Sequence, residues 1–272
     1  MRSHRKLRAA TVVCAAVIAG AAPAGWAAAT PAPSDVRIVA VAPSPDPFRG
    51  LSADEIGDRA VTATQSATSL RMAGRVTSDG QPVDIDLALN DKNECTGQMK
   101  IKGGTADLRQ AAKITYLKGD EPFWRASTAS QGLPQQRVDA TVELLKDRWL
   151  KITPGQEGSS DLSGVCDLKK LLDDMGDDAS ERKGLTRGPD AEVDGTPVAT
   201  VLKKKPGGET TTVSVSQEGK PHILKMVKTG GDEPGSIVLS DYDKPVKVVV
   251  PPANETLDVS KLNPSTGLNA ST

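Results

Sequence analysis

Helical spacing of small and apolar residues opens the part of the chain that we expect to fold. Ser52-Ala53-Asp54-Glu55 is a capping-box sequence, in which the Ser52 hydroxyl accepts from a backbone amide of the first turn and Glu55 reaches back to the Ser52 amide. Residues at helical spacing follow this box: Ile56, Ala60, Val61, Ala63, Thr64 and Ala67. The pattern predicts a helix that starts at the box, buries one modest apolar stripe and ends near Ser69.

Beyond this helix the apolar residues change from helical spacing to alternate positions. They occupy every second position from Val83 to Leu89, with Asp or Ala between them, which is typical of a strand with one buried and one wetted face. Similar short runs, usually parted by Gly, Pro, Asp or Asn, predict further strands at 96–102, 105–110, 113–118, 148–152, 198–203, 211–216, 222–228, 236–240 and 246–250.

These elements together predict an α+β fold in which one long antiparallel meander carries a few helices. Two stretches with apolar residues at helical spacing, 135–146 and 161–175, interrupt the strands. Because twist accumulates across a sheet of many strands, we expect the sheet to curl and the helices to cover its concave face. Alternation does not decide whether the space beneath the helices is a packed core or a ligand cavity, so both alternatives stay open.

The first 29 residues have the organisation of a secretory signal peptide. Four basic residues within the first eight precede an apolar run over 9–22, and Ala27-Ala28-Ala29 offers a cleavage site. Gly and Pro break the run before it reaches the roughly 20 apolar residues that a membrane-spanning helix needs. We therefore expect export, followed by a proline-rich spacer over 30–50, a folded domain over 51–262 and a flexible tail over 263–272. A short apolar patch within the spacer, at 36–41, is an alternative edge strand.

Cys14 lies inside this leader and raises the alternative of a lipid-anchored protein. The preceding Thr11-Val12-Val13 lacks the small residue that usually stands just ahead of a lipidated cysteine. Only about five residues separate Cys14 from the basic region, which is short for a lipoprotein leader. An exported protein without an anchor is the favoured interpretation, and lipid attachment at Cys14 is the alternative.

Charge and histidine content narrow the possible functions. The chain has 34 Lys and Arg against 35 Asp and Glu, and removal of a leader with four basic residues and no acidic ones leaves 30 against 35, a net charge of -5. The chain therefore lacks the excess of positive charge that nucleic-acid binding requires. Of two histidines, His4 lies in the leader, which leaves His222 alone for a zinc enzyme or a Ser-His-Asp hydrolase. We therefore expect no enzyme, no metal, no cofactor and no nucleic-acid partner.

Several conspicuous side chains have simple structural interpretations. Lys203-Lys204-Lys205 before a Pro-Gly-Gly turn could touch anionic lipid headgroups, but three charges beside a turn more often form an exposed hairpin tip. His222 is expected at a surface or strand edge. Trp124 and Trp149 are expected to anchor the core.

A set of runs in a fixed order carries a resemblance over nearly all of the chain after the spacer. The runs are 95–101 (CTGQMKI), 113–118 (KITYLK), 123–124 (FW), 149–151 (WLK), 165–168 (VCDL) and 251–258 (PPANETLD). They resemble the actinobacterial envelope proteins of the LppX and LprG type, which are similar in fold to the lipoprotein carrier LolA. The resemblance implies a half-barrel antiparallel sheet wrapped over helices and, as in several members, an apolar cavity that takes acyl chains.

Cys95 and Cys166 are the two cysteines that remain after leader removal. In an oxidising compartment an even pair most often forms a disulfide, and this one would close a loop of about 70 residues and stabilise the fold by roughly 4 kcal/mol. It would hold the helix predicted at 161–175 against the strand that begins near Thr96. Metal binding is the alternative, but two cysteines and the distant His222 make a poor zinc site.

The leading hypothesis is a non-enzymatic, exported cell-envelope protein that binds a lipid or acyl chain between sheet and helices, for carriage or sensing. Two acyl chains of about 14 carbons each would gain about 0.8 kcal/mol per shielded methylene, before the costs of ordering are subtracted. The residues expected to line the cavity lie on one face of the sheet: Leu87, Leu89, Met99, Ile101, Ile114, Val213, Val215 and Met226.

The alternative hypothesis is an envelope interaction or scaffold protein that has the same fold but a filled core. It would act through its surface or its proline-rich spacer. For the leading hypothesis the expected partner is a lipid or an acylated molecule, and peripheral association with the cell membrane stays open. A monomer is expected, although no feature of the sequence specifies the oligomeric state.

Overall fold

The computed structural model describes residues 46–261 of the chain, with gaps at 79, 130–131, 157–158 and 178–181. The expected leader with Cys14, the apolar patch at 36–41 and the tail at 263–272 lie outside the described residues. Of the expected spacer, 46–50 are described, and Phe48 within them is 3% exposed and packs in the hydrophobic core. The core therefore includes a residue of the expected spacer.

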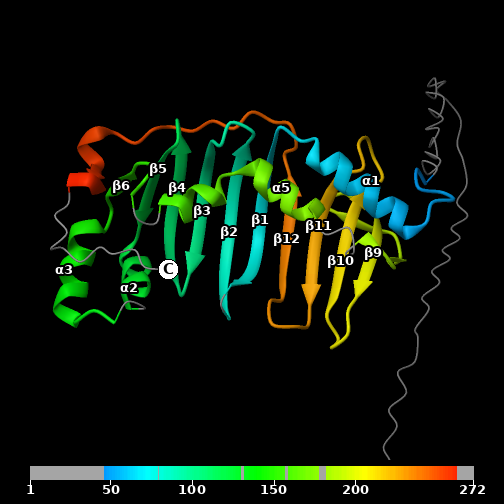
Figure 1. Ribbon diagram of the computed structural model, residues 1–272, viewed down its shortest axis with the longest axis horizontal. Coiled ribbons are helices and arrows are strands. Elements are labelled where there is room, and N and C mark those ends of the chain that lie inside the picture. Colours follow the sequence, from blue (N-terminus) through cyan, green and yellow to red (C-terminus); the bar gives the residue numbers. More distant parts are fainter. Residues whose placement is uncertain (1–45, 79, 130–131, 157–158, 178–181, 262–272) are drawn as a thin grey trace, which may run out of the picture. The chain divides into compact units, whose positions relative to one another are not determined.

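Thirteen strands of the described chain form one open sheet, which is antiparallel except for the pairing of β13 with β6 (Figure 1). The strands are β1 (Ser69–Ser78), β2 (Gln81–Asn90), β3 (Cys95–Ile101), β4 (Gly104–Ala111), β5 (Ile114–Gly119), β6 (Trp149–Ile152), β7 (Thr186–Arg187), β8 (Ala191–Val193), β9 (Thr196–Lys204), β10 (Thr210–Ser216), β11 (Ile223–Thr229), β12 (Gly235–Ser240) and β13 (Thr256–Asp258). Their order across the sheet is β13-β6-β5-β4-β3-β2-β1-β12-β11-β10-β9-β7, with β8 beside β9.

The sheet consists of two meanders rather than the single one that the sequence predicts. One meander runs outward from β1 to β6, and the other starts at the far edge with β9 and returns to β12, which pairs with β1 in the middle. Sequence alternation fixes neighbours along the chain but carries no sign of this long-range pair. Because β1 and β12 shield each other's edges, the two meanders form one continuous sheet.

The helices lie on one face of the sheet, as predicted (Figure 1). They are α1 (Ala53–Gln65), α2 (Glu121–Ala129), α3 (Gln135–Leu145), α4 (Ser159–Val165) and α5 (Leu168–Asp177), with short 3-10 turns η2 (Ala253–Glu255) and η3 (Val259–Lys261). α1 and α5 pack together near β9–β12, where Gln65 Nε2 donates to Leu172 O at 3.0 Å, whereas α2 packs on β4 and β5 and against α3. None of the described helices combines the length and apolar composition that a membrane span requires.

The start of α1 confirms the capping box. Ser52 Oγ accepts from the Glu55 amide at 3.2 Å, and the Glu55 carboxylate accepts from the Ser52 amide at 2.8 Å. The helix expected at 161–175 is instead two helices, because Asp167 caps a new one by accepting from the Lys170 amide at 3.0 Å. α2 was not predicted from the sequence, although Asp120 before Glu121-Pro122 is a start signal, and its carboxylate accepts from the Phe123 amide at 2.8 Å.

The strand predicted at 246–250 is wrong. These residues form a segment outside the sheet that crosses the ends of the strands in Figure 1, and Val249 and Val250 are 68% and 53% exposed. Prolines stand on both sides of the segment, at 245 and at 251–252, and proline cannot donate to a strand ladder. β1 was not predicted either, because Gly74 weakens its alternation.

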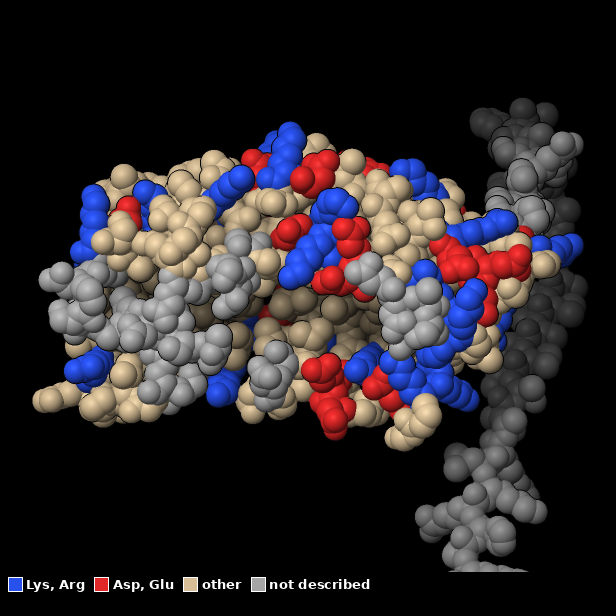
Figure 2. All heavy atoms as spheres, viewed as in Figure 1, with Lys and Arg blue, Asp and Glu red and all other residues tan. Residues whose placement is uncertain are grey.

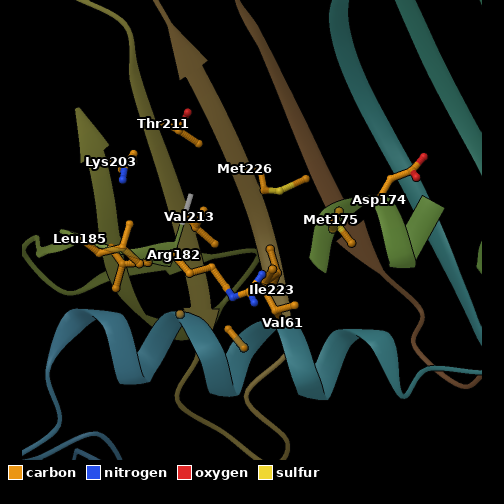
Figure 3. A pocket seen from close by; sticks show the side chains of 13 residues that line it. Val61, Asp174, Met175, Arg182, Leu185, Lys203, Thr211, Val213, Ile223 and Met226 are labelled. Atoms are coloured by element: carbon orange, nitrogen blue, oxygen red, sulfur yellow. The ribbon is translucent and has the colours of Figure 1, made fainter. Parts of the chain in front are cut away.

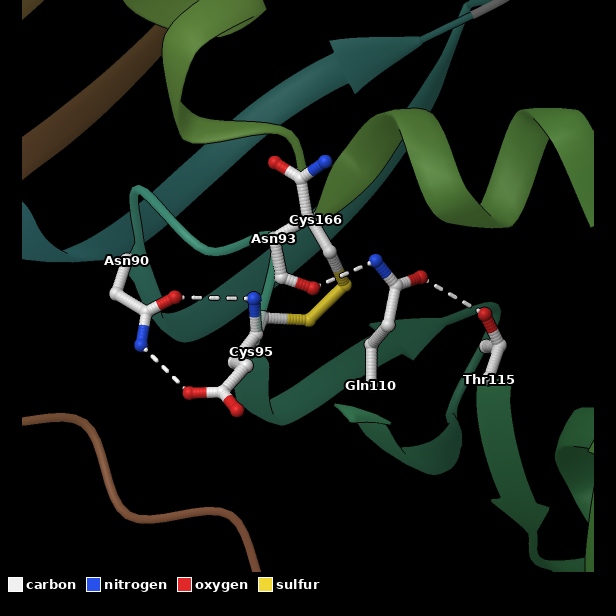
Figure 4. Close-up of a disulfide and its surroundings, with 7 residues drawn as sticks. Asn90, Asn93, Cys95, Gln110, Thr115 and Cys166 are labelled. Atoms are coloured by element: carbon white, nitrogen blue, oxygen red, sulfur yellow. Dashed lines mark hydrogen bonds between the residues drawn. A yellow bond between two sulfur atoms is a disulfide. The ribbon is translucent and has the colours of Figure 1, made fainter. Parts of the chain in front are cut away.

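The disulfide between Cys95 and Cys166 is present, as predicted (Figure 4). It joins the start of β3 to the junction of α4 and α5, with a Cα–Cα distance of 5.4 Å, and both residues are fully buried. Beside it, Gln110 Nε2 donates to Asn93 O at 2.8 Å and Thr115 Oγ1 donates to Gln110 Oε1 at 2.9 Å. The helix junction is thereby fixed to the concave face of β3–β5.

Trp124 and Trp149 are buried, as predicted, but the surface position expected for His222 is wrong. His222 is 9% exposed and its ring stacks on Tyr242, with centroids 4.1 Å apart. The Tyr242 hydroxyl donates to the carbonyl of Ile223, the first residue of β11. The segment that follows β12 covers His222, and a single sequence window does not reveal this contact.

Candidate functional site

Cross-strand register places one row of side chains along the concave face. Starting at the β9 edge, successive partners on adjacent strands are Val201, Val213, Met226, Ile237, Gly74, Ile85, Met99 and Ala106. Because partners in register share a face, this row is a nearly continuous apolar floor. What lies over the floor differs along its length.

Over the β9–β11 part of the floor there is a cavity of about 290 Å³ (Figure 3). α1 forms one wall, and Arg182 and Leu185, which precede β7, form another that we call the wall segment. Its apolar lining consists of Ala60, Val61, Leu185, Val201, Val213, Ile223 and Met226. In Figure 2 the face that carries α1 and α5 is hollowed over a floor of uncharged residues, and both basic and acidic residues stand around the hollow.

Small residues on α1 set the width of this site. Gly57 and Ala60 face the cavity, and a Cβ at Gly57 would stand 2.7 Å from Leu185 Cδ1. The helix and the wall segment therefore approach each other closely above an unfilled space. A larger residue at position 57 would push the wall outward.

Polar contacts hold the wall segment against α1. Arg182 Nε donates to Asp58 at 2.8 Å, and Arg182 Nη1 donates to Gly176 O at 2.6 Å. The Asp54 carboxylate accepts from the backbone amides of Gly184 and Leu185, at 3.2 and 2.8 Å. The Arg182–Asp58 contact is exposed and therefore weak, whereas the bond from the Leu185 amide to Asp54 is half-buried.

Charged and hydroxyl groups lie on the rim of the cavity. Asp174 stands on α5, whereas Lys203 and Thr211 are register partners on β9 and β10. Lys203 Nζ donates to the carbonyl of Lys183. Figure 3 shows Lys203 and Thr211 at the end of the cavity away from α1, with Asp174 at a distance from them.

The structure brings two of the expected lining residues to the cavity, Val213 and Met226. Leu87, Leu89 and Val215 share the concave face but are buried in the hydrophobic core. Met99 and Ile101 lie on that face too, half-buried against the core and away from the cavity.

Ile114 lies on the opposite face of the sheet from the other seven residues. In β5 the concave positions are Thr115 and Leu117, which pair with the buried Gln110 and Leu108. Ile114 pairs with Ala111, which alternation places on the convex side.

Lining residues from outside the sheet were not on the predicted list. Ala60 and Val61 belong to the helical stripe that the sequence shows at 56–67, so that stripe was a usable signal. Leu185 follows no periodic pattern, and its role depends on the long-range contact with Asp54. No group of residues suited to a metal ion occurs in the part of the chain that the structure describes.

A second hollow lies beside the disulfide and differs in character. It measures about 460 Å³ and has a mixed, largely polar lining that includes Gln110, Lys113, Thr115, Asp167 and Lys170. Gln110 and Thr115 are buried and bonded to each other. Of the two, the cavity beneath α1 is the one suited to an apolar ligand.

Comparison with known proteins bears on the fold. No protein-family model and no curated protein matches the chain. The crystal structure of LprF from Mycobacterium bovis superposes with a TM-score of 0.51 at 14% identity and covers 73% of this chain and 96% of its own. The lipoprotein LppX from Mycobacterium tuberculosis gives a TM-score of 0.47 at 17% identity, over 72% of this chain and 98% of its own. With the open sheet and its helices, the LprF match confirms the predicted LppX/LprG-type, LolA-like half-barrel fold.

Proposed function

We propose that this protein is an exported cell-envelope protein that binds a lipid or acyl chain in the cavity between α1 and β9–β11. The observation that carries the proposal is the cavity itself, a largely apolar space of about 290 Å³ on the concave face of the half-barrel. A cavity of this size lowers the stability of the fold, because the side chains that line it lose packing contacts. A bound ligand would restore those contacts.

Burial of methylene groups is the proposed mechanism. At about 30 Å³ per water-sized group, the cavity holds about ten such groups, and a methylene is of similar size. Ten methylenes at about 0.8 kcal/mol each give about 8 kcal/mol, from which the costs of association are subtracted. The cavity is thus smaller than the two chains of 14 carbons considered from the sequence.

Access to the cavity would come from the wall segment rather than the sheet. The segment around Arg182 and Leu185 is held to α1 by polar contacts, one exposed and one half-buried, whereas the floor is part of a hydrogen-bonded ladder. Local opening favours elements with few apolar contacts and exposed hydrogen bonds. Outward movement of this wall would admit a chain without disrupting the sheet.

Three features support an envelope location. The leader pattern over the first 29 residues is typical of export. The buried Cys95–Cys166 disulfide suits an oxidising compartment. The fold is shared with LprF, and the related comparison structure LppX is a lipoprotein. In this proposal the protein is a carrier or sensor without catalytic activity.

Native mass spectrometry of the protein purified from a secreting host tests the proposal. We expect a lipid-sized adduct that is lost on denaturation and recovered by organic extraction, since a ligand held by burial has no covalent link. An apo mass that stays unchanged after incubation with lipid extracts would contradict the proposal. That outcome would favour the interaction or scaffold protein with a filled core.

A further inference from the structure

The hollow beside the disulfide has buried polar side chains with unused bonding capacity. It measures about 460 Å³ and lies where β4 and β5 meet the start of α5. Gln110 and Thr115 line it and are each 2% exposed (Figure 4). Thr115 Oγ1 donates to Gln110 Oε1, and Gln110 Nε2 donates to Asn93 O. One amide N–H of Gln110 and the lone pairs of Thr115 Oγ1 are left without a partner among the described residues.

Two lysines stand on the rim of this hollow. Lys113 lies in the β4–β5 loop and Lys170 lies in the first turn of α5, and both are exposed. The side chain of neither lysine bonds to another residue that the structure describes. Asp167, the one carboxylate in the described lining, already caps α5 by accepting from the Lys170 amide at 3.0 Å. Two ammonium groups are therefore available to an anion at this rim.

The loop that carries Lys113 keeps side chains where glycine would be less strained. Ala111 pairs with Ile114, so Ala112 and Lys113 form a two-residue hairpin loop. Their φ angles are +49° and +65°, in the left-handed region that residues with a Cβ rarely adopt. Asn-Gly is the usual pair in such a turn. Lys113 therefore presents its charge beside the hollow at a conformational cost.

The disulfide holds the two sides of the hollow in place. Cys166 directly precedes Asp167 at the start of α5, and its partner Cys95 pairs across β3 and β4 with Gln110. The elements that carry Lys170 and Lys113 are thus linked covalently through the sheet. Such preorganisation lowers the cost of ordering the site when a ligand binds.

From these features we infer that the hollow binds a soluble phosphorylated sugar. The ammonium groups of Lys113 and Lys170 hold the phosphate by charge-assisted hydrogen bonds, and Gln110 and Thr115 bond to sugar hydroxyls. Ile152 contacts the C–H groups of the ring. At about 30 Å³ per water-sized group, the hollow holds about 15 such groups. A hexose phosphate, with about 16 non-hydrogen atoms, matches this size, whereas free phosphate, with about five, leaves most of it unfilled.

This site is separate from the cavity of the proposed function. The hollow lies at β4 and β5, whereas the floor of the cavity is centred on β10. The strand order β4-β3-β2-β1-β12-β11-β10 puts six spacings between them along the sheet, roughly 29 Å at about 4.8 Å each. A ligand sized for the cavity does not extend across this distance. Sugar phosphate binding therefore does not depend on lipid binding under α1.

Titration calorimetry of the secreted protein with glucose 6-phosphate, glucose and inorganic phosphate separates the two parts of the ligand. We expect glucose 6-phosphate to bind at least tenfold more tightly than either fragment. Lys113→Gln and Lys170→Gln should each weaken this binding about fivefold, which corresponds to about 1 kcal/mol. Both variants should bind decanol, a ten-carbon probe of the cavity under α1, as wild type does.

Matched control variants remove the same charge from lysines that do not line the hollow. Lys102 occupies a left-handed position with φ +49° in the β3–β4 loop, at the opposite ends of the strands. Lys169 is next to Lys170 on α5 and pairs with Asp173 at 2.9 Å. Lys102→Gln and Lys169→Gln should bind glucose 6-phosphate as wild type does. An equal loss in the control variants would overturn the inference, because it would make the effect one of overall charge.

The remaining outcomes separate this site from the proposed function. Glucose binding as tight as that of glucose 6-phosphate would overturn the role of the phosphate, and equally tight phosphate binding would overturn the sugar. Binding to phosphatidylinositol vesicles without binding to a soluble probe would overturn a soluble ligand. Binding of none of these probes would overturn the inference, and decanol binding by the same sample would leave the proposed lipid site standing.

Discussion

The two halves of the concave face use the same alternation of side chains and reach different results. Beneath α2, over β4 and β5, the face is filled: Leu108 and Leu117 are buried and α2 packs directly on the strands. Nearby, the disulfide fixes the junction of α4 and α5 beside the second hollow, whose lining is more polar. Over β9–β11 the face carries the cavity, and α1 with its adjoining wall spans it through polar contacts. Strand patterning therefore makes a face apolar, and the element above it decides between core and cavity.

Two glycines, Gly104 and Gly119, stand where α2 contacts the strands of the filled half. A Cβ at Gly104 would stand 2.1 Å from the Phe123 amide nitrogen, and one at Gly119 would stand 2.4 Å from Phe123 Cδ1. α2 thus lies in direct contact with β4 and β5. In the cavity half the facing strand positions are Val213 and Met226, which line the space beneath α1. Direct contact of α2 with the strands therefore closes one half of the concave face, whereas a space remains beneath α1 in the other half.

The largest expected effect is loss of the disulfide that fixes the filled half. Replacing both Cys95 and Cys166 by Ser should lower the free energy of unfolding by about 4 kcal/mol, since the bridge closes a loop with a sequence separation of 71. Urea unfolding followed by circular dichroism measures this. If the variant loses less than about 1 kcal/mol, the bridge does not fix the filled half.

A smaller effect is expected when side chains are truncated in each of the two halves. Leu108→Ala removes a fully buried side chain and should cost about 3 kcal/mol of unfolding free energy. Val213→Ala removes a half-buried side chain beside an existing space and should cost less than about 1.5 kcal/mol. Equal costs in thermal or urea unfolding would mean that the cavity half is packed like the filled half.

The pH dependence of stability provides a third comparison, within the cavity half. Burial lowers the pKa of His222, helped by the nearby Lys220 and opposed by Asp243. Below the ordinary histidine pKa of about 6.5 the unfolded chain gains a proton that the folded protein resists, so stability is full above that pH and falls as the pH drops toward 5.

His222→Phe keeps a ring against Tyr242 and removes the titrating group. The variant should lose part of the decline in unfolding free energy between pH 7 and pH 5. Urea unfolding at several pH values measures it, with Lys204→Gln, a lysine that does not contribute to the lowered His222 pKa, as a control that retains the histidine. A decline as steep as in wild type would show that His222 is not its source.

Local patterns in the sequence predicted the helices and strands better than they predicted which strands pair. The alternation over 83–90 and the capping box at Ser52 correspond to β2 and α1, because both depend on neighbours in the chain. The pairing of β1 with β12 joins segments more than 150 residues apart and left no local trace. The cysteine pair was predictable since two thiols in an exported chain have few alternatives.

The sequence predicted which face of the sheet carries the candidate site, but not where on that face the site lies. Val213 and Leu87 have equivalent alternation, yet one lines the cavity and the other lies in the core. The distinction depends on where α1 and Leu185 fold over the sheet, which is set by Asp54 and Asp58 contacts across more than 120 residues. Periodicity within a strand holds no information on such contacts.

The most direct test of the central claim fills the cavity and leaves the sheet intact. Val213→Trp would occupy the space beneath α1, whereas Val227→Trp adds the same bulk at a half-buried valine on the convex face of the neighbouring strand. Decanol binding to each folded variant is measured by titration calorimetry. We predict that Val213→Trp loses at least tenfold in affinity and that Val227→Trp binds as wild type does. Unchanged decanol affinity in Val213→Trp would contradict an apolar ligand site between α1 and β9–β11.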